Sequence, residues 1–363
     1  MDLFLTGATG AVGGNLLRHL LDARTDSSIY VLLRASTDDE LRERLLPILA
    51  TVTAEQACRI IPVAGDVMLR DLGLGATQPA WISRIGEIYH VAACTSFCQS
   101  MDEASRTNLA GTKHVIDFAR SIQETGAAVR LHHVSTAYVS GKRTGYLKEN
   151  ELESGQEFFN YYEWSKFEAE RLVRAASAEL PVAIYRPGII VGDSRTGHTS
   201  RFHGIYQILR GIHYGLIDSL PCEPDFQLDI TPVDYVSDAI IGLSQLSGSA
   251  DKTFHLTAGP GNTLSLGELV DIYLREGTTC EGSKYRPGSL RFAPCVNDSP
   301  ARNGAAPHGW RRFSPYLPYV TCPKTFDNSV TRATLPDLQA PDCREYLPKV
   351  VRYALESGFA QVV

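Results

Sequence analysis

The stretch that decides the fold is LFLTGATGAVGGNLLRHLLDAR, which spans residues 3–24. It opens on a short apolar run, which is typical of a buried strand, and it closes on leucines that recur at helical spacing from Leu16 to Leu21. Between the two lies a GxxGxxG pattern that runs from Gly7 to Gly13. The stretch therefore predicts a strand, a tight glycine turn and a helix in immediate succession.

The same alternation of apolar runs and amphipathic stretches continues to about residue 190. Further strands are expected at 29–33, 60–64, 87–93, 129–135, 181–187 and 254–258, and helices at 108–123 and 161–179. Several of these strands are nearly continuous apolar runs, which indicates strands covered by helices on both faces. The pattern predicts an α/β fold with a doubly wound parallel sheet of the Rossmann type.

The rhythm breaks after Gly197, which indicates a second, smaller and partly irregular lobe. A helix is expected near 202–216 and another near 343–355, whereas 280–320 is rich in Pro, Gly and Arg with little periodicity. We therefore expect a dinucleotide-binding domain at 1–196, to which 229–258 return, and a substrate lobe made of 197–228 and 259–363.

Composition excludes several classes of protein. The chain has 363 residues with 44% apolar and 21% charged side chains, which excludes disorder, collagen and coiled coil. Its formal charge of −6 gives no electrostatic reason to expect nucleic acid or an anionic membrane as a partner.

Cysteine usage and hydropathy indicate a reducing compartment. The eight cysteines form no CxxC pair and no zinc-spaced cluster with histidine, so neither a disulfide framework nor a metal site is expected. No apolar run approaches the roughly 20 residues of a membrane span, and the N-terminus lacks the basic start of a signal peptide. We expect a cytoplasmic protein whose oligomeric state the sequence leaves open.

The glycine turn has the features of a site for a dinucleotide. The first glycine permits the tight turn, the second lets the backbone approach a pyrophosphate, and the third lets the helix pack closely on the strand. The helix N-terminus supplies free N–H groups to the phosphates. The residues expected to contact the dinucleotide are Thr6, Gly7, Thr9, Gly10, Ala11, Val12, Gly13, Arg34, Arg44, Asp66, Val67, Ala92 and Lys166.

The end of the second strand favours NADPH over NADH. NAD sites usually carry a carboxylate here for the ribose 2′-hydroxyl, whereas this chain has Arg34, whose guanidinium can bind a 2′-phosphate. Arg44 could add a second positive charge. The alternative is that Arg34 is only a solvated surface residue.

Two residues near the next strand ends have both a binding and a structural interpretation. Asp66 follows the third strand, where it can accept from an adenine amino group or simply cap a turn. Small residues up to Ala93 end the fourth strand and would let the backbone approach the cofactor. His90, at the start of that segment, is interpreted as a core histidine with satisfied hydrogen bonds.

Tyr162 and Lys166 form the candidate catalytic pair. They are four residues apart, so a phenol and an ammonium share one helix face, and the ammonium is expected to lower the pKa of the phenol. The preceding strand ends in a Ser-Thr pair, and a hydroxyl there can join Tyr162 on one carbonyl oxygen as an oxyanion site. Tyr161 competes with Tyr162, and Ser135 competes with Thr136, for these roles.

These motifs together resemble a known family. TGATGAVGG, HVAA, NLAGT, HVSTAYVSG, YxxxK, YRPGIIVGDSRTG and TPVDYVSDAI occur in the order and spacing of extended short-chain dehydrogenases/reductases. HVSTAYVSG, GDSRTG and PVDYV are similar, more narrowly, to the thioester reductase branch, which includes peptide synthetase reductase domains, carboxylic acid reductases and fatty acyl-CoA reductases. The resemblance covers roughly residues 1–260 and is weak over 280–320.

The resemblance implies a role for each matching residue. Tyr162 would be the general acid, Lys166 its partner and Thr136 the oxyanion donor. Asn108 would sit near the lysine and its water relay. The resemblance further implies that the nicotinamide is lined by Pro187 and Gly188.

The implied reaction is the NADPH-dependent reduction of an acyl thioester to an aldehyde. The substrate would be carried on an acyl or peptidyl carrier protein or on CoA, and the sequence leaves open whether a second reduction gives the alcohol. This chain shows no adenylation or carrier domain. The alternatives are a ketone or aldehyde reductase or nucleotide-sugar-modifying enzyme of the same superfamily, and a non-catalytic NADP sensor.

The helix expected near 202–216 has two interpretations. It carries apolar and aromatic side chains at helical spacing, including Ile205 and Leu209. One edge could line a channel for an apolar acyl chain, with the thioester arm entering past 280–320. Alternatively, the helix packs on the core of its own lobe.

Overall fold

The computed structural model describes residues 1–75, 79–277, 290–292 and 313–360. Its centre is a seven-stranded, all-parallel sheet in the order β12-β7-β5-β4-β1-β2-β3. The strands are β1 (Asp2–Thr6), β2 (Ile29–Leu33), β3 (Ile60–Ala64), β4 (Ile85–His90), β5 (Arg130–Val134), β7 (Val182–Pro187) and β12 (Lys252–Leu256). The predicted doubly wound sheet is confirmed, and β2 and β3 have the predicted bounds.

The strand register brings the predicted site to one edge of the sheet. Thr6 pairs with His90, and His90 in turn pairs with His133, one residue before the end of β5. Val134 pairs with Tyr185 of β7. The carboxyl ends of β1, β4, β5 and β7 therefore lie together, and this is the edge at which doubly wound folds bind ligands.

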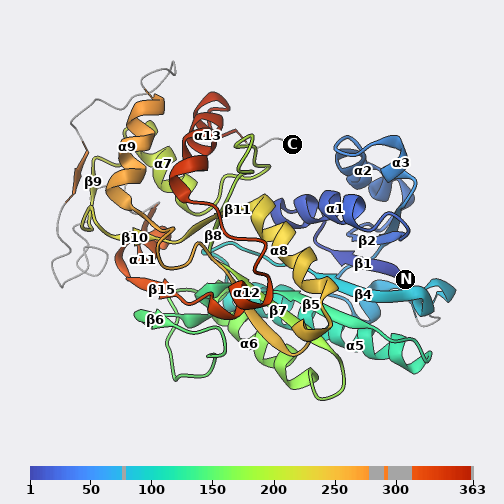
Figure 1. Cartoon of the computed structure of the whole chain (residues 1–363). Helices are drawn as coiled ribbons and strands as arrows, with labels where there is room; N and C mark the ends of the chain where they lie inside the picture. The colour runs from blue at the N-terminus through green and yellow to red at the C-terminus, as the bar shows by residue number, and fades with distance from the viewer. Residues whose placement is uncertain (76–78, 278–289, 293–312, 361–363) are drawn as a thin grey trace.

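Helices cover both faces of the sheet, as the apolar runs predict (Figure 1). Leucines of α1 and apolar side chains of α2 and α8 form one core with β1, β2 and β12, and α5 and α6 form a second core on the other face. The bounds are α1 (Ala11–Ala23), α2 (Asp38–Leu49), α3 (Ala54–Ala57), α4 (Met101–Ala104), α5 (Gly111–Glu124), α6 (Tyr161–Ala176) and α8 (Val233–Gln245). A π-helical segment, η3 (Ser105–Ala110), joins α4 to α5, so the helix expected at 108–123 begins earlier than predicted.

A third core lies outside the main sheet, where α7, α9 and α13 stand together (Figure 1). These elements are α7 (Ile205–His213), α9 (Leu266–Gly277) and α13 (Cys343–Glu356), with the short strands β8 (Ile189–Val191), β9 (Ser219–Leu220), β10 (Gln227–Leu228), β11 (Ile230–Pro232), β13 (Leu264–Ser265) and β14 (Arg291–Phe292). Ile205 and Leu209 are 4% and 2% exposed within this core. Their burial favours the interpretation that α7 packs on its own lobe, rather than lining a channel.

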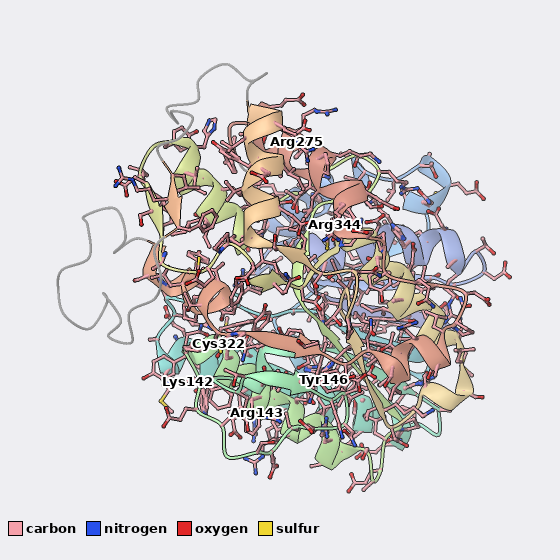
Figure 2. All side chains as sticks on the ribbon, turned by 60° about the vertical axis from the view of Figure 1, so that its left-hand side comes forward. Lys142, Arg143, Tyr146, Arg275, Cys322 and Arg344 are labelled. Carbon is pink, nitrogen blue, oxygen red and sulfur yellow. The ribbon has the colours of Figure 1, made fainter. Side chains whose placement is uncertain are left out.

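Residues 324–334 return to the main sheet domain, although the predicted division assigns them to the lobe, whereas Phe313 and Val320 just before them are buried in the third core. The elements from 313 to 334 are η6 (Ser314–Tyr316), α11 (Pro318–Thr321), β15 (Lys324–Phe326) and α12 (Ser329–Thr334). β15 pairs in parallel with β6 (Gly145–Leu147), and the Tyr146 hydroxyl donates to Asp327 at 3.0 Å. Figure 2 shows Cys322 near Lys142 and Arg143 on this side of the molecule, and the thiol contacts their carbonyls.

The carboxylate of Glu149 joins α12 to β12 of the main sheet. It accepts from the backbone N–H of His255 in β12 and from those of Val330 and Thr331 in α12. The rest of the segment predicted to be irregular, 280–320, falls outside the described residues apart from 290–292 and 313–320. The division into two domains stays a prediction.

Within the described part of the chain, no helix is long and apolar enough to cross a membrane.

Candidate active site

Thr136 and Tyr162 meet at the carboxyl end of β5. Thr136 lies two residues beyond the strand, 4% exposed, and caps the short helix η4 (Ala137–Ser140) by accepting from the Tyr138 N–H at 3.2 Å. Tyr162 stands in the first turn of α6, and its hydroxyl lies close enough to that of Thr136 for the Thr136 hydroxyl to lower the pKa of the phenol. The two hydroxyls that the sequence proposes for one carbonyl oxygen are thus neighbours.

The pKa of Tyr162 is raised to about 12, whereas the sequence led us to expect a lowered value. Burial is the main cause, the Thr136 hydroxyl opposes it, and Glu163 and Cys94 add to it. Lys166 contributes nothing to the pKa shift of the phenol, and its ammonium donates to the Val134 carbonyl at 2.8 Å. The phenol is therefore protonated at neutral pH, which is the state that a proton donor requires.

The two competing residues, Tyr161 and Ser135, make other contacts. Tyr161 is 47% exposed and lies edge-on to Trp164. Ser135 donates to Glu170 at 2.8 Å. Thr136 and Tyr162 are thus the pair left facing one another.

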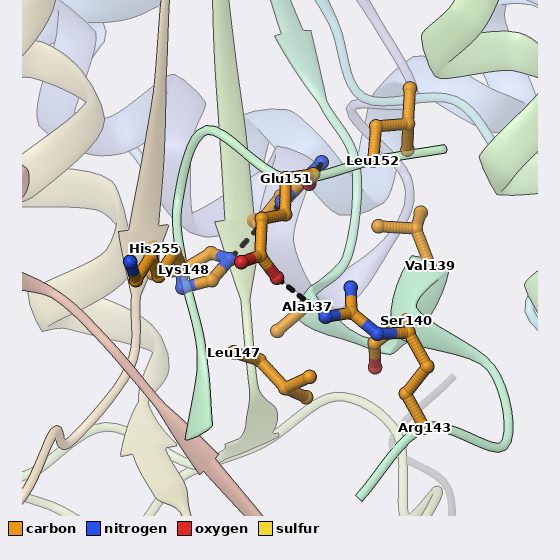
Figure 3. Close-up of a pocket in the computed structure, with 10 residues that line it drawn as sticks. Ala137, Val139, Ser140, Arg143, Leu147, Lys148, Glu151, Leu152 and His255 are labelled. Atoms are coloured by element: carbon orange, nitrogen blue, oxygen red, sulfur yellow. Dashed lines mark hydrogen bonds and ion pairs between the residues drawn. The ribbon is translucent and has the colours of Figure 1, made fainter. Parts of the chain in front are cut away.

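Glu170 belongs to a buried ion-pair network behind β5. Arg186, 2% exposed, binds it through two nitrogens at 2.6 and 2.9 Å. Burial alone would raise the pKa of Glu170, but the nearby Arg186 and Arg174 together lower it. Figure 3 shows a pocket beside this network, where Arg143 pairs with Glu151 and none of the predicted site residues forms the wall.

Lys166 is 3% exposed, and burial lowers its pKa to about 8 although Glu170 opposes the shift. Its ammonium also lies near His90 and His133, whose pKa values fall because of burial and then because of that charge. Lys166 is thus a cation held at the carboxyl ends of β4 and β5. It lies four residues after Tyr162, as predicted.

Asn108 fastens two segments of the site to each other. Its amide nitrogen donates to the Cys94 carbonyl at 3.0 Å and to the Ser165 hydroxyl at 2.9 Å, and its oxygen accepts from the Cys94 N–H at 2.8 Å. It stands in η3, and such π-helical turns often occur at functional sites. Asn108 therefore links the loop after β4 to the helix that carries Tyr162, while its relay role stays a prediction.

The glycine turn fits a dinucleotide. Gly7 has φ +80°, and a Cβ there would lie 2.6 Å from the Ala92 nitrogen; a Cβ at Gly13 would lie 2.1 Å from the Gly7 oxygen. Gly10 is the N-cap of α1 and offers no side-chain acceptor to the first N–H groups of that helix. These N–H groups and the bare turn form a cradle for phosphates.

Thr6 and His90 support the cradle from beneath. The Thr6 hydroxyl lies 2.9 Å from His90 Nδ1 and accepts from the N–H groups of Val91 and Ala92 at 3.2 Å. His90 Nε2 lies 3.0 Å from the Thr112 hydroxyl. The interpretation of His90 as a core histidine with satisfied hydrogen bonds agrees with these contacts.

The remaining predicted cofactor residues lie along the same edge. Arg34 and Arg44 are exposed, and within the described residues neither forms an ion pair, while Glu40 accepts from the Ser36 N–H at 2.7 Å between them. Asp66 accepts from the Met68 N–H at 2.9 Å, as the turn interpretation expects. Thr9 is exposed, and Ala11, Val12 and Ala92 are half-buried.

Three further predicted positions show specific backbone contacts. The Val67 carbonyl contacts the His114 ring at 2.8 Å. The Pro187 carbonyl lies 3.5 Å from the Thr136 hydroxyl. A Cβ at Gly188 would lie 3.0 Å from Asp229 Oδ1, so no larger residue fits there without a shift.

Two motifs from the sequence have a structural function. Asp234 of PVDYV accepts from the Ser194 N–H at 2.9 Å and from its hydroxyl, which fastens the GDSRTG loop to α8. A Cβ at Gly197 would lie 2.3 Å from the Lys349 carbonyl of α13. These motifs therefore join the sheet domain to the third core. Among the described residues no group of three or more His, Cys, Asp or Glu side chains could hold a metal ion.

Fold and site together define an NAD(P)-dependent reductase with a Rossmann sheet. Residues 5–240 match the family of NAD-binding proteins described as male sterility protein, and the chain belongs to that family.

Individual relatives agree with this membership. The chain is 36% identical over 264 residues to a linear gramicidin synthase from Brevibacillus parabrevis, an alignment that covers 69% of this chain and 5% of that protein. It is 27% identical over 273 residues to the fatty acyl-CoA reductase wat of Drosophila melanogaster, which covers 66% of this chain and 53% of that protein. The chain thus spans about half or less of the length of these relatives.

Solved structures resemble the chain over almost all of its length. The terminal R domain from the myxalamid PKS-NRPS biosynthetic pathway has a TM-score of 0.82 at 30% identity and covers 99% of this chain and 92% of that one. The reductase domain of a nonribosomal peptide synthetase from Mycobacterium tuberculosis has a TM-score of 0.71 at 23% identity, over 99% of this chain and 91% of that one, and shows the same fold.

Proposed function

We propose that this chain reduces an acyl thioester to an aldehyde with NADPH. The observation that carries the proposal is the proximity of the Thr136 and Tyr162 hydroxyls at the carboxyl end of β5, beside Pro187 and Gly188. The resemblance to a terminal R domain and the family membership support thioesters as the substrate class.

In the proposed mechanism each site residue acts on the substrate carbonyl. NADPH, held by the glycine turn, would supply the hydride that reduces the carbonyl carbon. Thr136 and Tyr162 donate hydrogen bonds to the oxygen as negative charge develops on it, which stabilises the transition state. Tyr162 then transfers its proton to that oxygen, and the resulting hemithioacetal breaks its C–S bond to give the aldehyde and a free thiol.

Lys166 and the glycine turn hold the cofactor in this proposal. Lys166 would hydrogen-bond the nicotinamide ribose, the N-terminus of α1 would bind the pyrophosphate, and Arg34 would bind the 2′-phosphate. The exposure of Arg34, which forms no ion pair within the described residues, supports NADPH over NADH. A cytoplasmic location, where NADPH is available to a reductase, is part of the same proposal.

The acyl group would enter from the side of residues 313–326. A hollow there is lined by Tyr138, Phe226, Leu228, Tyr319 and Phe326, with Asp229 and Lys324 as its charged members. The apolar side chains suit a hydrophobic acyl chain. The thiol part would be a pantetheine arm, on an acyl or peptidyl carrier protein or on CoA.

NADPH oxidation by the purified chain against matched substrates tests the proposal. The panel contains acyl-CoA thioesters, the same acyl groups on a carrier protein, and the corresponding free aldehydes. Turnover of thioesters with release of a thiol supports the proposal. Turnover of carbonyls alone would replace it with a ketone or aldehyde reductase, and NADPH binding without any turnover would indicate a sensor.

A further inference from the structure

Glu163 is a carboxylate buried directly beside the catalytic phenol. It follows Tyr162 in α6 and has no exposed surface. Oε2 accepts from the Phe159 N–H at 3.0 Å, and Oε1 accepts from the Tyr319 hydroxyl at 2.7 Å. Burial raises the pKa of Glu163, and these two donors oppose the shift.

Tyr319 reaches this carboxylate from a distant part of the chain. It stands in α11, and 156 residues separate it from Glu163. Asn160, which caps α6 by accepting from the Glu163 N–H at 3.0 Å, also donates to the Tyr319 hydroxyl at 2.9 Å. The Tyr319 hydroxyl thus accepts from the cap of the catalytic helix and donates to its third residue.

The ring of Tyr319 is held as firmly as its hydroxyl. It stacks on Phe97 with centroids 4.6 Å apart and planes 11° apart, and Tyr138 meets it edge-on at 4.8 Å. Phe97 in turn lies 5.8 Å from the Tyr162 ring. Tyr319 therefore contacts the surroundings of the phenol through its hydroxyl, by Glu163, and through its ring, by Phe97.

We propose that Tyr319 is a positioning residue for Tyr162, and that its hydroxyl fixes the first turn of α6 so that the phenol faces Thr136. The inference rests on the proposed role of Tyr162 as the proton donor. It applies to any carbonyl that this site reduces, because it concerns the donor and not the acyl group. A small displacement of a catalytic group can cost a large factor in rate.

Tyr319→Phe removes only the hydroxyl and leaves the ring stack in position. We expect about a tenfold loss of kcat, equal for short and long acyl thioesters, with an unchanged dissociation constant for NADPH. The matched control is Tyr316→Phe, since Tyr316 contacts Phe97 at 5.3 Å and its hydroxyl has no hydrogen-bond partner among the described residues. This control should keep the full rate.

A double-mutant cycle separates positioning from mere stability. In a Tyr162→Phe background, the loss of the Tyr319 hydroxyl should leave the residual rate unchanged, because there is no phenol to position. Equal rate losses in both backgrounds would overturn the inference. A loss of kcat confined to long acyl chains would also overturn it, because Tyr319 would then act only as a wall of the hollow that it lines. Circular dichroism and thermal unfolding confirm that each variant is folded.

The failure of this inference is distinguishable from the failure of the proposed function. If the wild-type chain reduces only aldehydes, the thioester proposal fails and the same cycle is run on the aldehyde. If wild type turns over and Tyr319→Phe matches it, the positioning role fails alone. If no carbonyl is reduced, both fail.

Discussion

The hydroxyls of Ser135 and Thr136, two consecutive residues just after β5, lie in different surroundings. Ser135 donates to Glu170 in a buried network where Arg186 and Arg174 satisfy the carboxylate. The hydroxyl of Thr136, the next residue, lies close to that of Tyr162. Around Ser135, the buried acceptor and donors all have partners. Around Thr136, the hydroxyls of Thr136 and Tyr162 face each other near the predicted cofactor site.

The difference shows how one sheet edge supports both stability and chemistry. Buried polar groups with full sets of partners rigidify a structure, and those with spare donors can act on a substrate. The two sets are joined, because α6 carries both Tyr162 and Glu170. The ion pairs behind β5 therefore hold the helix that carries the candidate proton donor, Tyr162.

The largest expected effect is at Tyr162. Tyr162→Phe should lower kcat by about 10²–10⁴-fold, the usual contribution of a general acid, while NADPH still binds with its wild-type dissociation constant. Stopped-flow oxidation of NADPH with a thioester measures the first quantity, and fluorescence titration measures the second. Near-normal turnover would transfer the role to Tyr161 or another group.

The adjacent hydroxyls should separate rate from stability. Thr136→Ala should lower kcat by about 10²–10³-fold, as for the loss of one oxyanion donor, and Thr136→Ser should restore most of it. Ser135→Ala should keep kcat but lower the free energy of unfolding by about 1–3 kcal/mol, because a buried carboxylate loses a donor. Urea unfolding and steady-state kinetics on the three variants decide; a reversed pattern would mean that Ser135 is the oxyanion donor.

Cofactor choice is expected to depend on Arg34. The wild-type chain should bind NADPH at least tenfold more tightly than NADH, and Arg34→Asp should remove that preference because a carboxylate repels the 2′-phosphate. Arg42→Ala is the matched control, since Arg42 is exposed on α2 and already paired with Asp39. Equal dissociation constants for the two cofactors in the wild-type chain would contradict the prediction.

A smaller effect is expected from the titration of Lys166. Because the pKa of Lys166 is about 8, its ammonium is fully charged well below pH 8 and loses its charge as the pH rises through 8. If the ammonium holds the nicotinamide ribose, NADPH binding should weaken several-fold between about pH 7 and 9. Isothermal titration over this range should show no such change in Lys166→Met, and a dependence that persists in the variant would belong to another group.

Local patterns were sufficient to predict the sheet, and they also supply the candidate pair Tyr162 and Lys166, whose catalytic role stays a prediction. The apolar runs of β2 and β3 and the glycines from Gly7 to Gly13 predict the Rossmann unit because strand and turn preferences act over a few residues. The spacing of Tyr162 and Lys166 likewise follows from one helix. The contact of Ser135 with Glu170 favours Thr136 as the oxyanion donor, and no spacing in the sequence reveals that contact. The role of Thr136 stays a prediction.

Long-range contacts explain what the sequence did not predict. The expected lowering of the Tyr162 pKa was wrong because burial raises this pKa, and the effect of Thr136 that opposes the rise is smaller. Ser165, although it lies inside the YxxxK motif, gave no signal of its contact with Asn108. The contact between Glu163 and Tyr319 was not predicted, because the two residues are 156 positions apart in the sequence. Tyr319 also lies where the sequence has little periodicity.

The hydrogen bonds that the Glu149 carboxylate accepts have a consequence for the order in which the protein folds. All seven strands of the main sheet have been synthesised once Leu256 is added, yet two of the backbone donors of Glu149 come from Val330 and Thr331. Until α12 is synthesised, water takes the place of these two donors at the carboxylate. The sheet domain and the segment at 324–334 should consequently melt in a single cooperative transition.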